Sequence, residues 1–379
     1  MVFKALKDIA HITMGQSPES ESYNDERVGI PFFQGNADFG EIYPNNRIWC
    51  SSPKKIAEPG DILISVRAPI GALNYAKERC CIGRGLAAIS IKDEAERNYV
   101  FHLLKAKNKE LNSKGTGSTF KAIGKNVLEE VLVPQISPKE QKKRMSIMDY
   151  LESIIRKRRE QLLFLDKLIK ARFVEMFGNP VANEKGWNVD LCKNLTTKIG
   201  SGATPKGGKE SYLTKGISLI RSLNVHNNKF VYDDLACISE EQAKKLNNVI
   251  IQQGDVLLNI TGASVARCCI VPNSVLPARV NQHVSIIRCN EKLLPVFVSC
   301  MFTDDNFQQF LLNVATGGGA TREAITKEEI EKFVLITPPI ERQKKFADFV
   351  EQIDKSKFNV NCRNLYSLCI RKVRGTLWP

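Results

Sequence analysis

Two glycine-rich stretches carry side chains that could contact a phosphate. The stretch from Gly200 to Lys206 ends in a cation, and the stretch from Gly317 to Arg322 stands just before an expected helix start. Glycines let a ligand approach the backbone closely, and amides at a helix start suit a phosphate. The spacing is neither that of a Walker loop nor GxGxxG after a strand. These loops therefore favour contacts to a nucleic-acid backbone over a nucleotide site.

Other loop residues offer donors and acceptors to the edges of bases. Asn281, Gln282 and His283 are adjacent, and Arg84 lies at the matching place in the first half of the chain. For each residue alone, loop structure or surface solvation is the more frequent explanation, whereas their joint occurrence on a basic chain favours DNA. The expected DNA-binding residues are Arg67, Arg84, Gly115, Thr116, Gly117, Ser118, Thr119, Lys121, Ser201, Gly202, Thr204, Lys206, Arg221, Asn224, Thr261, Asn281, Gln282, His283, Gly317, Gly318, Thr321 and Arg322.

No catalytic constellation is visible in the sequence. The chain has only 4 His, and it contains no HExxH, no nucleophile elbow and no paired metal carboxylates. The stretch after Gly178 reads Asn179-Pro180-Val181, which is the wrong continuation for an amino-methyltransferase. The sequence therefore offers no candidate catalytic or metal-binding residue. Nuclease carboxylates are dispersed in sequence, so a nuclease site stays an alternative.

The charge balance points to an acidic partner. The 379 residues include 55 Lys and Arg against 41 Asp and Glu, a formal net charge of +14. Such an excess favours a polyanion or an acidic protein, although some soluble proteins are merely basic. No apolar run approaches the length of a membrane span and no signal-peptide core is present, so a cytoplasmic location is expected. The 11 Cys form no CxxC pair, which predicts reduced, buried thiols.

A long helix is expected from Gln141 to Phe177. The stretch contains no Gly or Pro, Pro138 precedes it, and Gly178 ends it. Its seam positions are spaced alternately by three and four, with Arg158 and Arg172 in two of the slots, which is typical of a coiled-coil seam. A long helix packed across one large domain is the alternative. At about 1.5 Å per residue the rod would be roughly 55 Å long. The seam consists of Met148, Leu151, Ile155, Leu162, Leu165 and Ile169.

The chain repeats itself. The sequence from Gly115 aligns with that from Gly317, with seven identities within sixteen positions, and Gln141-Lys142-Lys143 recurs as Gln343-Lys344-Lys345. Earlier matches pair Pro18 with Pro205, in the same order along the chain. The repeat predicts two globular domains, each followed by a long helix. The second helix carries a less regular seam, formed by Phe346, Val350, Ile353 and Val360.

Two such helices can pair antiparallel, with a pseudo-twofold relation between the domains. Beyond Asn361 the apolar stripe shifts to Leu365, Leu368 and Val373, where we expect a kink, a slip or a face for another partner. The expected divisions are a first domain over 1–136, a central helix over 137–180, a second domain over 181–338 and a C-terminal helix over 339–379.

Each domain is expected to be α+β with a mostly β core, because short apolar segments alternate with turns. Strands are expected in the first domain at Ile30–Phe33, Asp61–Val66, Leu86–Ile91 and Val131–Val133, with a helix at Glu96–Lys107. In the second domain strands are expected at Ser218–Arg221, Val256–Ile260, Val284–Arg288 and Phe333–Ile336. Its helices are expected at Ser239–Leu246, Pro295–Thr303 and Asp305–Val314.

With these features the chain resembles the DNA-specificity subunit of type I restriction–modification systems. The resemblance covers almost the whole length. It rests on the duplicated domains that alternate with long helices, and on five stretches that stand here as Pro59–Pro69, Cys81–Ile89, Thr261–Ser264, Asn281–Val284 and the run Pro-Pro-Ile-Glu-Arg-Gln from Pro338.

The resemblance implies a non-catalytic subunit that binds double-stranded DNA. Each domain would read one half of an asymmetric bipartite site, and the two helices would set the distance between the halves. Two modification subunits would carry S-adenosylmethionine, and restriction subunits would use ATP and Mg. Two other classes stay open. One is a stand-alone sequence-specific DNA-binding protein, and the other is a variant of a fused methyltransferase–endonuclease.

Overall fold

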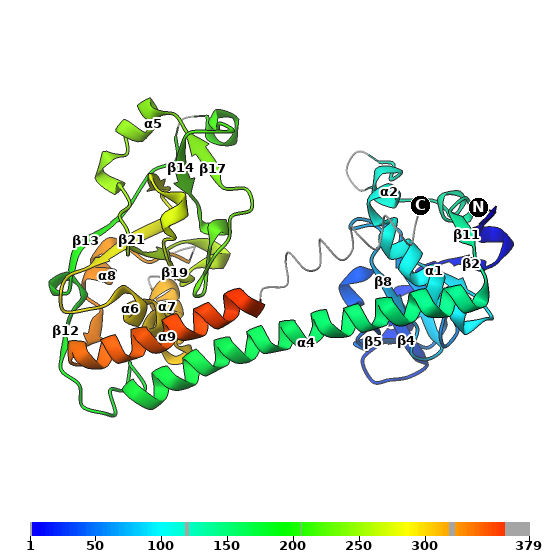
Figure 1. The fold of residues 1–379 in the computed structure, drawn as a ribbon, viewed down its shortest axis with the longest axis horizontal. Helices are drawn as coiled ribbons and strands as arrows, with labels where there is room; N and C mark the ends of the chain where they lie inside the picture. Colours follow the sequence, from blue (N-terminus) through cyan, green and yellow to red (C-terminus); the bar gives the residue numbers. More distant parts are fainter. Residues whose placement is uncertain (1, 118–120, 206, 318–322, 361–379) are drawn as a thin grey trace. The chain divides into compact units, whose positions relative to one another are not determined.

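The described part of the chain forms two compact units. The computed structural model describes residues 2–117, 121–205, 207–317 and 323–360. Of these, residues 2–159 belong to unit 1 and residues 160–360 to unit 2, so the division falls inside helix α4 (Pro138–Phe177). Each unit contains both sheets and helices (Figure 1).

Unit 1 is built on a four-stranded antiparallel sheet with strand order β2-β10-β7-β8. These strands are β2 (His11–Met14), β7 (Ile62–Ser65), β8 (Leu73–Tyr75) and β10 (Leu86–Ser90). A five-stranded sheet has the order β3-β5-β4-β9-β6. Its strands are β3 (Tyr23–Asn24), β4 (Ile30–Phe33), β5 (Ile48–Cys50), β6 (Ile56–Ala57) and β9 (Cys80–Ile82). Separately, β1 (Val2–Ala5) pairs antiparallel with β11 (Leu132–Gln135).

Three helices and the start of α4 cover the core of unit 1. They are α1 (Glu94–Ala106), α2 (Asn108–Ser113) and α3 (Lys125–Glu129). The side chain of Asp93 caps α1 by accepting a hydrogen bond from the Glu96 amide at 2.7 Å. Tyr99 and Leu104 of α1 are fully buried, and Met145 of α4 joins the same core. The first turns of α4 are thus part of the unit 1 core.

Unit 2 repeats the four-stranded sheet with the order β13-β21-β18-β19. These strands are β13 (Thr196–Ser201), β18 (Val256–Asn259), β19 (Cys268–Ile270) and β21 (Val284–Cys289). Three smaller sheets comprise β12 (Val189–Leu191) with β22 (Val334–Ile336), β15 (Val225–His226) with β16 (Lys229–Phe230), and β14 (Ile217–Ile220) with β17 (Ala236–Ile238) and β20 (Ala278–Val280). The helices are α5 (Glu240–Lys244), α6 (Pro295–Phe302), α7 (Asp305–Thr316), α8 (Lys327–Glu331) and α9 (Ile340–Val360).

The topology of unit 1 therefore recurs in unit 2. The central sheets have corresponding strand orders, and the pair β1-β11 corresponds to β12-β22. The parallel pairing of β4 with β9 also recurs, as β14 with β20. The expected α+β class with a duplicated domain is confirmed at this level. The expected domain divisions stay a prediction.

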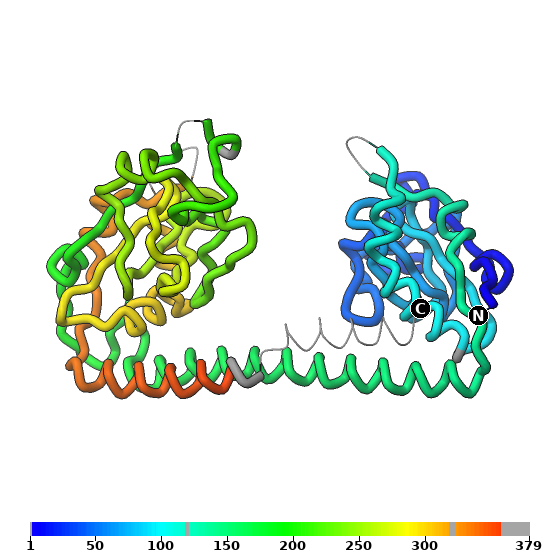
Figure 2. The backbone as a smooth tube through the Cα atoms, turned by 45° about the horizontal axis from the view of Figure 1, so that its top comes forward, coloured from blue at the N-terminus to red at the C-terminus, as the bar shows by residue number. Residues whose placement is uncertain are grey.

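In unit 2, α9 runs antiparallel to the C-terminal half of α4 (Figures 1 and 2). Near the start of α9 the Phe346 ring lies 5.6 Å from that of Phe173 and 5.5 Å from that of Phe177. Near its end the Lys357 ammonium lies 2.8 Å from an Asp166 carboxylate oxygen. The contacts run in opposite directions along the two helices, so this part of the expected pairing is observed.

The seam residues differ in how deeply they are buried. Ile169, Phe346 and Val350 belong to the unit 2 core, and Ile353 packs against it. The other α4 seam residues are half-buried, namely Met148, Leu151, Ile155, Leu162 and Leu165. The sequence pattern missed Phe173 and Phe177, which are buried against Phe297 of α6 rather than lying on the three-four seam. The side chain of Val360 lies outside the described residues.

Most expected elements are present with shifted ends. The long helix begins at Pro138 rather than Gln141, since Pro is accepted in the first turn of a helix. The helix expected over Ser239–Leu246 is shorter, at Glu240–Lys244. The expected stripe of Leu365, Leu368 and Val373 lies outside the described residues.

The cysteines in the described part of the chain are free thiols, most of them buried. Burial raises the pKa of the Cys80 and Cys192 thiols to about 12, so these groups stay protonated and unreactive near neutral pH. Within the same ranges, none of the helices has the length and apolar content needed to cross a bilayer.

Truncating Phe346 should loosen unit 2. Phe346→Ala removes a fully buried ring from the aromatic cluster and should cost about 3–5 kcal/mol of unfolding free energy. Amide hydrogen exchange of β18 and β21 would measure the loss. Phe164→Ala is the matched control, because this α4 ring is 66% exposed. Equal protection in both variants would remove Phe346 from the core of unit 2.

A buried histidine should make unit 1 sensitive to acid. Burial lowers the pKa of His102, a shift that Glu152 and Asp149 of α4 only partly oppose and Lys105 reinforces. The unfolded chain therefore binds a proton more readily than the folded chain, so this contribution to stability is present above about pH 6.5 and is lost below it. His102→Gln should flatten the fall in the urea midpoint between about pH 7.5 and 5, whereas His11→Gln, on an exposed side chain, should not.

Candidate nucleic-acid interface

Four loops of unit 2 meet at one end of its central sheet. The Gly202 amide donates to the Asn281 carbonyl at 3.1 Å, and the Asn281 amide donates to the Ile220 carbonyl at 3.0 Å. The Ile260 amide donates to the His283 carbonyl at 3.0 Å. A Cβ atom on Gly202 would lie 1.8 Å from the Val280 carbonyl oxygen, so only glycine allows this approach.

Side chains at this junction form a polar network. Gln282 accepts a hydrogen bond from the Thr204 amide at 3.1 Å through its Oε1 atom. The Thr261 hydroxyl lies 2.6 Å from His283 Nδ1, and His283 Nε2 lies 3.4 Å from Gln282 Nε2. Gln282 is exposed, whereas Thr204, Thr261 and His283 are half-buried. The network holds Gln282 at the surface, where its Nε2 atom keeps one N–H group unused.

Unit 1 forms the same junction with other side chains. The Gly83 amide donates to the Phe33 carbonyl at 2.8 Å, and the Gly85 amide donates to the Gln34 carbonyl at 3.1 Å. A Cβ atom on Gly15 would lie 2.1 Å from the Gly83 carbonyl oxygen. Arg84, between the two turn glycines, is exposed. The loops after β2 and β4 and the turn before β10 thus converge as they do in unit 2.

The described segments that flank the repeated glycine-rich stretches, which begin at Gly115 and Gly317, are bonded beside these junctions. In unit 1, Thr116 and Ala122 exchange backbone hydrogen bonds of 3.0 and 2.9 Å, and the Ile123 amide donates to Val66, at the end of β7, at 2.9 Å. In unit 2, the Ile325 amide donates to Ile260 at 2.8 Å, and Thr261 forms an isolated bridge with Ala324. In both units the chain that follows the glycine-rich loop is therefore bonded to the end of a central strand.

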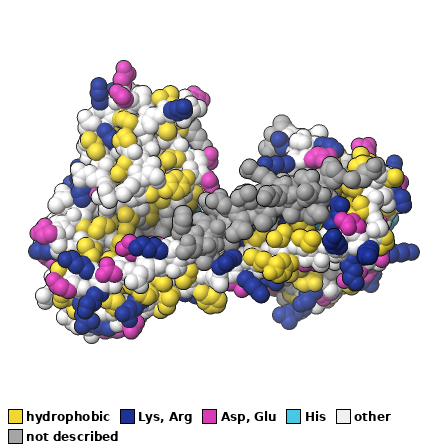
Figure 3. Space-filling view, viewed as in Figure 1, with side chains coloured by type: hydrophobic (Ala, Val, Ile, Leu, Met, Phe, Trp, Pro, Cys, Tyr) yellow, Lys and Arg dark blue, Asp and Glu magenta, His cyan; other side chains and the backbone are white. Residues whose placement is uncertain are grey.

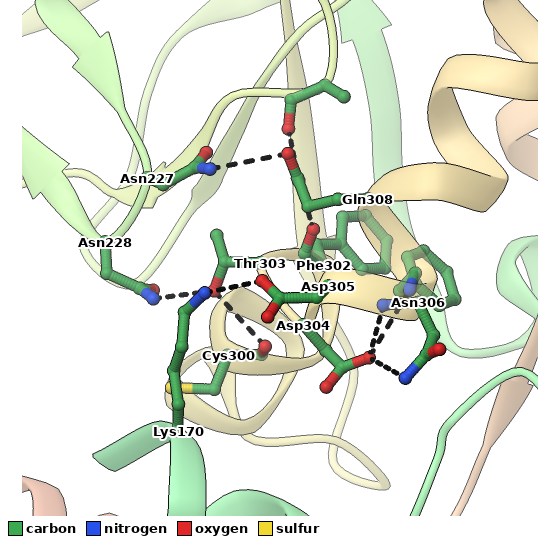
Figure 4. Close-up of polar contacts among 12 residues, drawn as sticks. Lys170, Asn227, Asn228, Cys300, Phe302, Thr303, Asp304, Asp305, Asn306 and Gln308 are labelled. Atoms are coloured by element: carbon green, nitrogen blue, oxygen red, sulfur yellow. Dashed lines mark hydrogen bonds and ion pairs between the residues drawn. The ribbon is translucent and has the colours of Figure 1, made fainter. Parts of the chain in front are cut away.

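Helix α7 leads into the second glycine-rich loop and is held by a polar network (Figure 4). Asn228, in the turn between β15 and β16, donates to the Thr303 hydroxyl at 2.6 Å. Gln308 donates to the Ala266 carbonyl at 2.8 Å, and Asp304 caps the helix by accepting from the Asn306 amide at 3.0 Å. Lys170 of α4 lies 2.7 Å from a carboxylate oxygen of Asp305. These contacts fix the helix that ends directly before Gly317.

The structure corrects two of the expected contacts. Asn224 is fully buried, where its side chain accepts from the Arg221 amide at 3.1 Å and donates to the Val231 carbonyl at 2.9 Å. Asn281 is 4% exposed, and its side-chain oxygen accepts from the His283 amide at 3.1 Å. Both amides stabilise turns, so they are not available to bases.

The remaining expected residues divide by exposure. The exposed ones are Arg67, Arg84, Thr116, Gly117, Lys121, Gln282 and Gly317. The half-buried ones are Gly115, Ser201, Gly202, Thr204, Arg221, Thr261 and His283. Those outside the described residues are Ser118, Thr119, Lys206, Gly318, Thr321 and Arg322. On the face of each unit shown in Figure 3, Lys and Arg side chains lie scattered among Asp and Glu.

A family model described as the type I restriction modification DNA specificity domain matches residues 1–163 and again residues 185–364. The chain belongs to this family. One match contains the loop junction of unit 1 and the other contains that of unit 2, so the specificity domain occurs twice in the chain.

Two relatives are specificity subunits of Methanocaldococcus jannaschii. The type I restriction enzyme MjaIX specificity subunit is 25% identical over an alignment of length 409, which covers 99% of this chain and 91% of that protein. The putative type I restriction enzyme MjaX specificity subunit is 46% identical over 155 residues, 40% of this chain, and the chain spans only 36% of its length. The crystal structure of the type I restriction-modification S subunit from M. genitalium has a TM-score of 0.54 at 13% identity over 99% of this chain and 94% of that one, which shows a shared fold.

Sequence reasoning on this specificity-domain chain missed two residues at the unit 1 junction. Ser17 and Gln34 are hydrogen-bonded to each other, and the Ser17 hydroxyl also accepts from the Arg84 amide at 3.4 Å. A signal was present, because the alignment of Pro18 with Pro205 also pairs Ser17 with Thr204.

A cavity of about 620 Å³ lies elsewhere in unit 1, between α1, β8 and α4. His102, Asp149 and Glu152 line it together with the stacked rings of Tyr75 and Phe101. Lys105 donates to Glu152 at 2.7 Å, so one of these carboxylates is already paired. Over the described ranges, His, Cys, Asp and Glu side chains form no cluster of three or more suited to a metal ion.

Adding a methyl group at Gly15 should disrupt the unit 1 junction. Gly15→Ala places Cβ against a backbone oxygen and should cost about 1–3 kcal/mol of unfolding free energy through displaced backbone. Gly35→Ala is the matched control in the same loops, because its Cβ meets nothing within 4 Å and its φ of −172° suits any residue. Urea unfolding of the full chain would measure both. Equal stabilities would show that close approach at Gly15 is not required.

Proposed function

We propose that this chain is the DNA sequence-specificity subunit of a type I restriction–modification complex. The observation that carries the proposal is the junction of converging loops that occurs in each unit on the same backbone plan but with different exposed side chains. Two junctions with the same backbone arrangement but different exposed side chains suit two different half-sites on DNA. The recognised site would therefore be bipartite and asymmetric, with one half read by each unit.

The helices would act as a spacer. Helix α4 has 40 residues, and the antiparallel contacts of α9 with its C-terminal half support a helical pair. We infer that the pair forms an antiparallel coiled coil with a pseudo-twofold relation between the domains. The distance between the half-sites would then depend on helix length, which a rigid rod keeps constant.

The chain would direct catalysis performed by other subunits. Two modification subunits would bind S-adenosylmethionine, and restriction subunits would use ATP and Mg, whereas this chain would supply DNA recognition alone. Exposed apolar side chains on α4 support subunit docking, because Tyr150 is 67% exposed and Phe164 is 66% exposed. The name of each relative as a specificity subunit supports the same assignment.

Methylome sequencing would test this function directly. A methylation-deficient host would receive this chain with its modification subunit, and a second culture would receive the modification subunit alone. A new bipartite methylated motif that requires this chain is the expected result. Tight, sequence-specific binding by the chain without any partner would instead favour a stand-alone DNA-binding protein. Binding of S-adenosylmethionine by the purified chain would favour the fused-enzyme variant.

Phosphate contacts should be visible in the salt dependence of DNA binding. Arg67 and Lys121 are exposed beside the unit 1 junction, where the Ala68 amide donates to the Lys121 carbonyl at 3.0 Å. Replacement of either by Ala should weaken binding of the assembled complex and lower the slope of log K against log salt by about one per lost contact. Lys4→Ala, on the exposed edge strand β1, is the control. An unchanged slope would place the residue outside the interface.

A further inference from the structure

Three loop positions of unit 1 have equivalents in unit 2. Ser17 aligns with Thr204, because each precedes the proline that the two halves share. Gln34 and Arg221 each directly follow the last residue of an equivalent strand, β4 or β14. Arg84 and Gln282 each occupy the middle of the turn that leads into β10 or β21. We call these the first, second and third loop positions.

Backbone hydrogen bonds establish the equivalence of the third position. The backbone amide of Gly83, directly before Arg84, donates to the carbonyl of Phe33, the last residue of β4, at 2.8 Å. The backbone amide of Asn281, directly before Gln282, donates to the carbonyl of Ile220, the last residue of β14, at 3.0 Å. On the other side of each turn, the Gly85 carbonyl accepts from the Val66 backbone amide at 2.9 Å, and the His283 carbonyl accepts from the Ile260 backbone amide at 3.0 Å. The turns therefore have the same place and bonding in both units.

The second and third positions carry the same two side-chain types in opposite order. Unit 1 has Gln34 at the second position and Arg84 at the third, whereas unit 2 has Arg221 at the second and Gln282 at the third. The amide is exposed in both units. Each junction therefore carries one amide and one guanidinium, with their places exchanged, and of the two guanidinium groups Arg84 is exposed and Arg221 half-buried.

The residue at the first position anchors the amide in both units. In unit 1 the Ser17 hydroxyl lies 3.2 Å from Oε1 and 3.1 Å from Nε2 of Gln34. In unit 2 the Thr204 backbone amide donates to Oε1 of Gln282 at 3.1 Å. An amide held at one point loses fewer rotamers on binding and keeps the donors and acceptors that a base edge requires.

The second position is also held rigidly. The Asp38 carboxylate accepts from the backbone N–H of Gln34 at 2.8 Å and from the backbone N–H of Gly35 at 3.2 Å, which fixes the turn that carries Gln34. In unit 2 the Arg221 guanidinium carbon lies 5.2 Å from the Tyr212 ring centroid, and the guanidinium donates to the Asp234 carbonyl. Such positioning before binding is what direct readout requires.

We propose that the second and third loop positions determine base specificity, and that the exchanged amide and guanidinium make the two half-sites differ. This inference rests on the proposed DNA-reading function. A glutamine amide pairs with the N6 and N7 atoms of adenine, and an arginine pairs with O6 and N7 of guanine, both in the major groove. Gln34 and Gln282 then each read an adenine, one in each half-site. Ser17 and Thr204 act as positioning residues.

Competition binding with the assembled complex would test the assignment. The wild-type motif would first be obtained by methylome sequencing, and duplexes with each base pair replaced in turn would then compete for the complex. Gln34→Ala should lose about five- to 150-fold discrimination at a single A·T position of one half-site. Gln282→Ala should lose it at one position of the other half-site only.

Controls distinguish a role in base recognition from a purely structural role. Gln135→Ala removes an amide of the same kind from β11 of unit 1 and should leave every position unchanged. Uniform weakening by Gln34→Ala at all duplexes would show a structural role and overturn the proposal, as would unchanged discrimination. A wild-type complex without any bipartite preference would instead contradict the proposed function itself.

Discussion

The close approach of backbone segments at one end of each central sheet is the constraint on which the proposed binding surface depends. In unit 1 this approach requires Gly15, and in unit 2 it requires Gly202, because a Cβ atom at either place would overlap a carbonyl oxygen. The loops are then joined mainly by backbone hydrogen bonds. The exposed side chains project from a framework that rests mostly on these backbone bonds, on the two glycines and on a few turn residues such as Asp38 and Asn224.

The hydrophobic core explains why that framework is stable. Strands β7 and β18 are fully buried, and in each unit helices contribute to the same hydrophobic core as the central sheet. In unit 2, Phe173 and Phe177 of α4 meet Phe297 and Phe346 in one aromatic cluster. Burial of such rings contributes several kcal/mol each. The long helix is thus a core element of the unit as well as a rod.

The sequence predicted the elements better than the contacts between loops. Hydrophobic periodicity located the long helix to within three residues at its start, and the repeat predicted a common topology. Asn224 and Asn281 were misassigned because an amide that stabilises a turn has the same sequence signature as one that reads a base. Ser17 and Gln34 were missed because their contact joins residues that are distant in sequence, and only the folded backbone brings them together.

The predominance of backbone bonds at the junction has an evolutionary consequence. A substitution at an exposed loop position removes few of the contacts that hold the fold, so its stability cost should be small. Under the proposed function, new target sequences would then be accessible through single amino-acid changes in one unit while the other unit kept its own target. Divergence of the two halves would therefore cost little stability, and selection could act on each half independently.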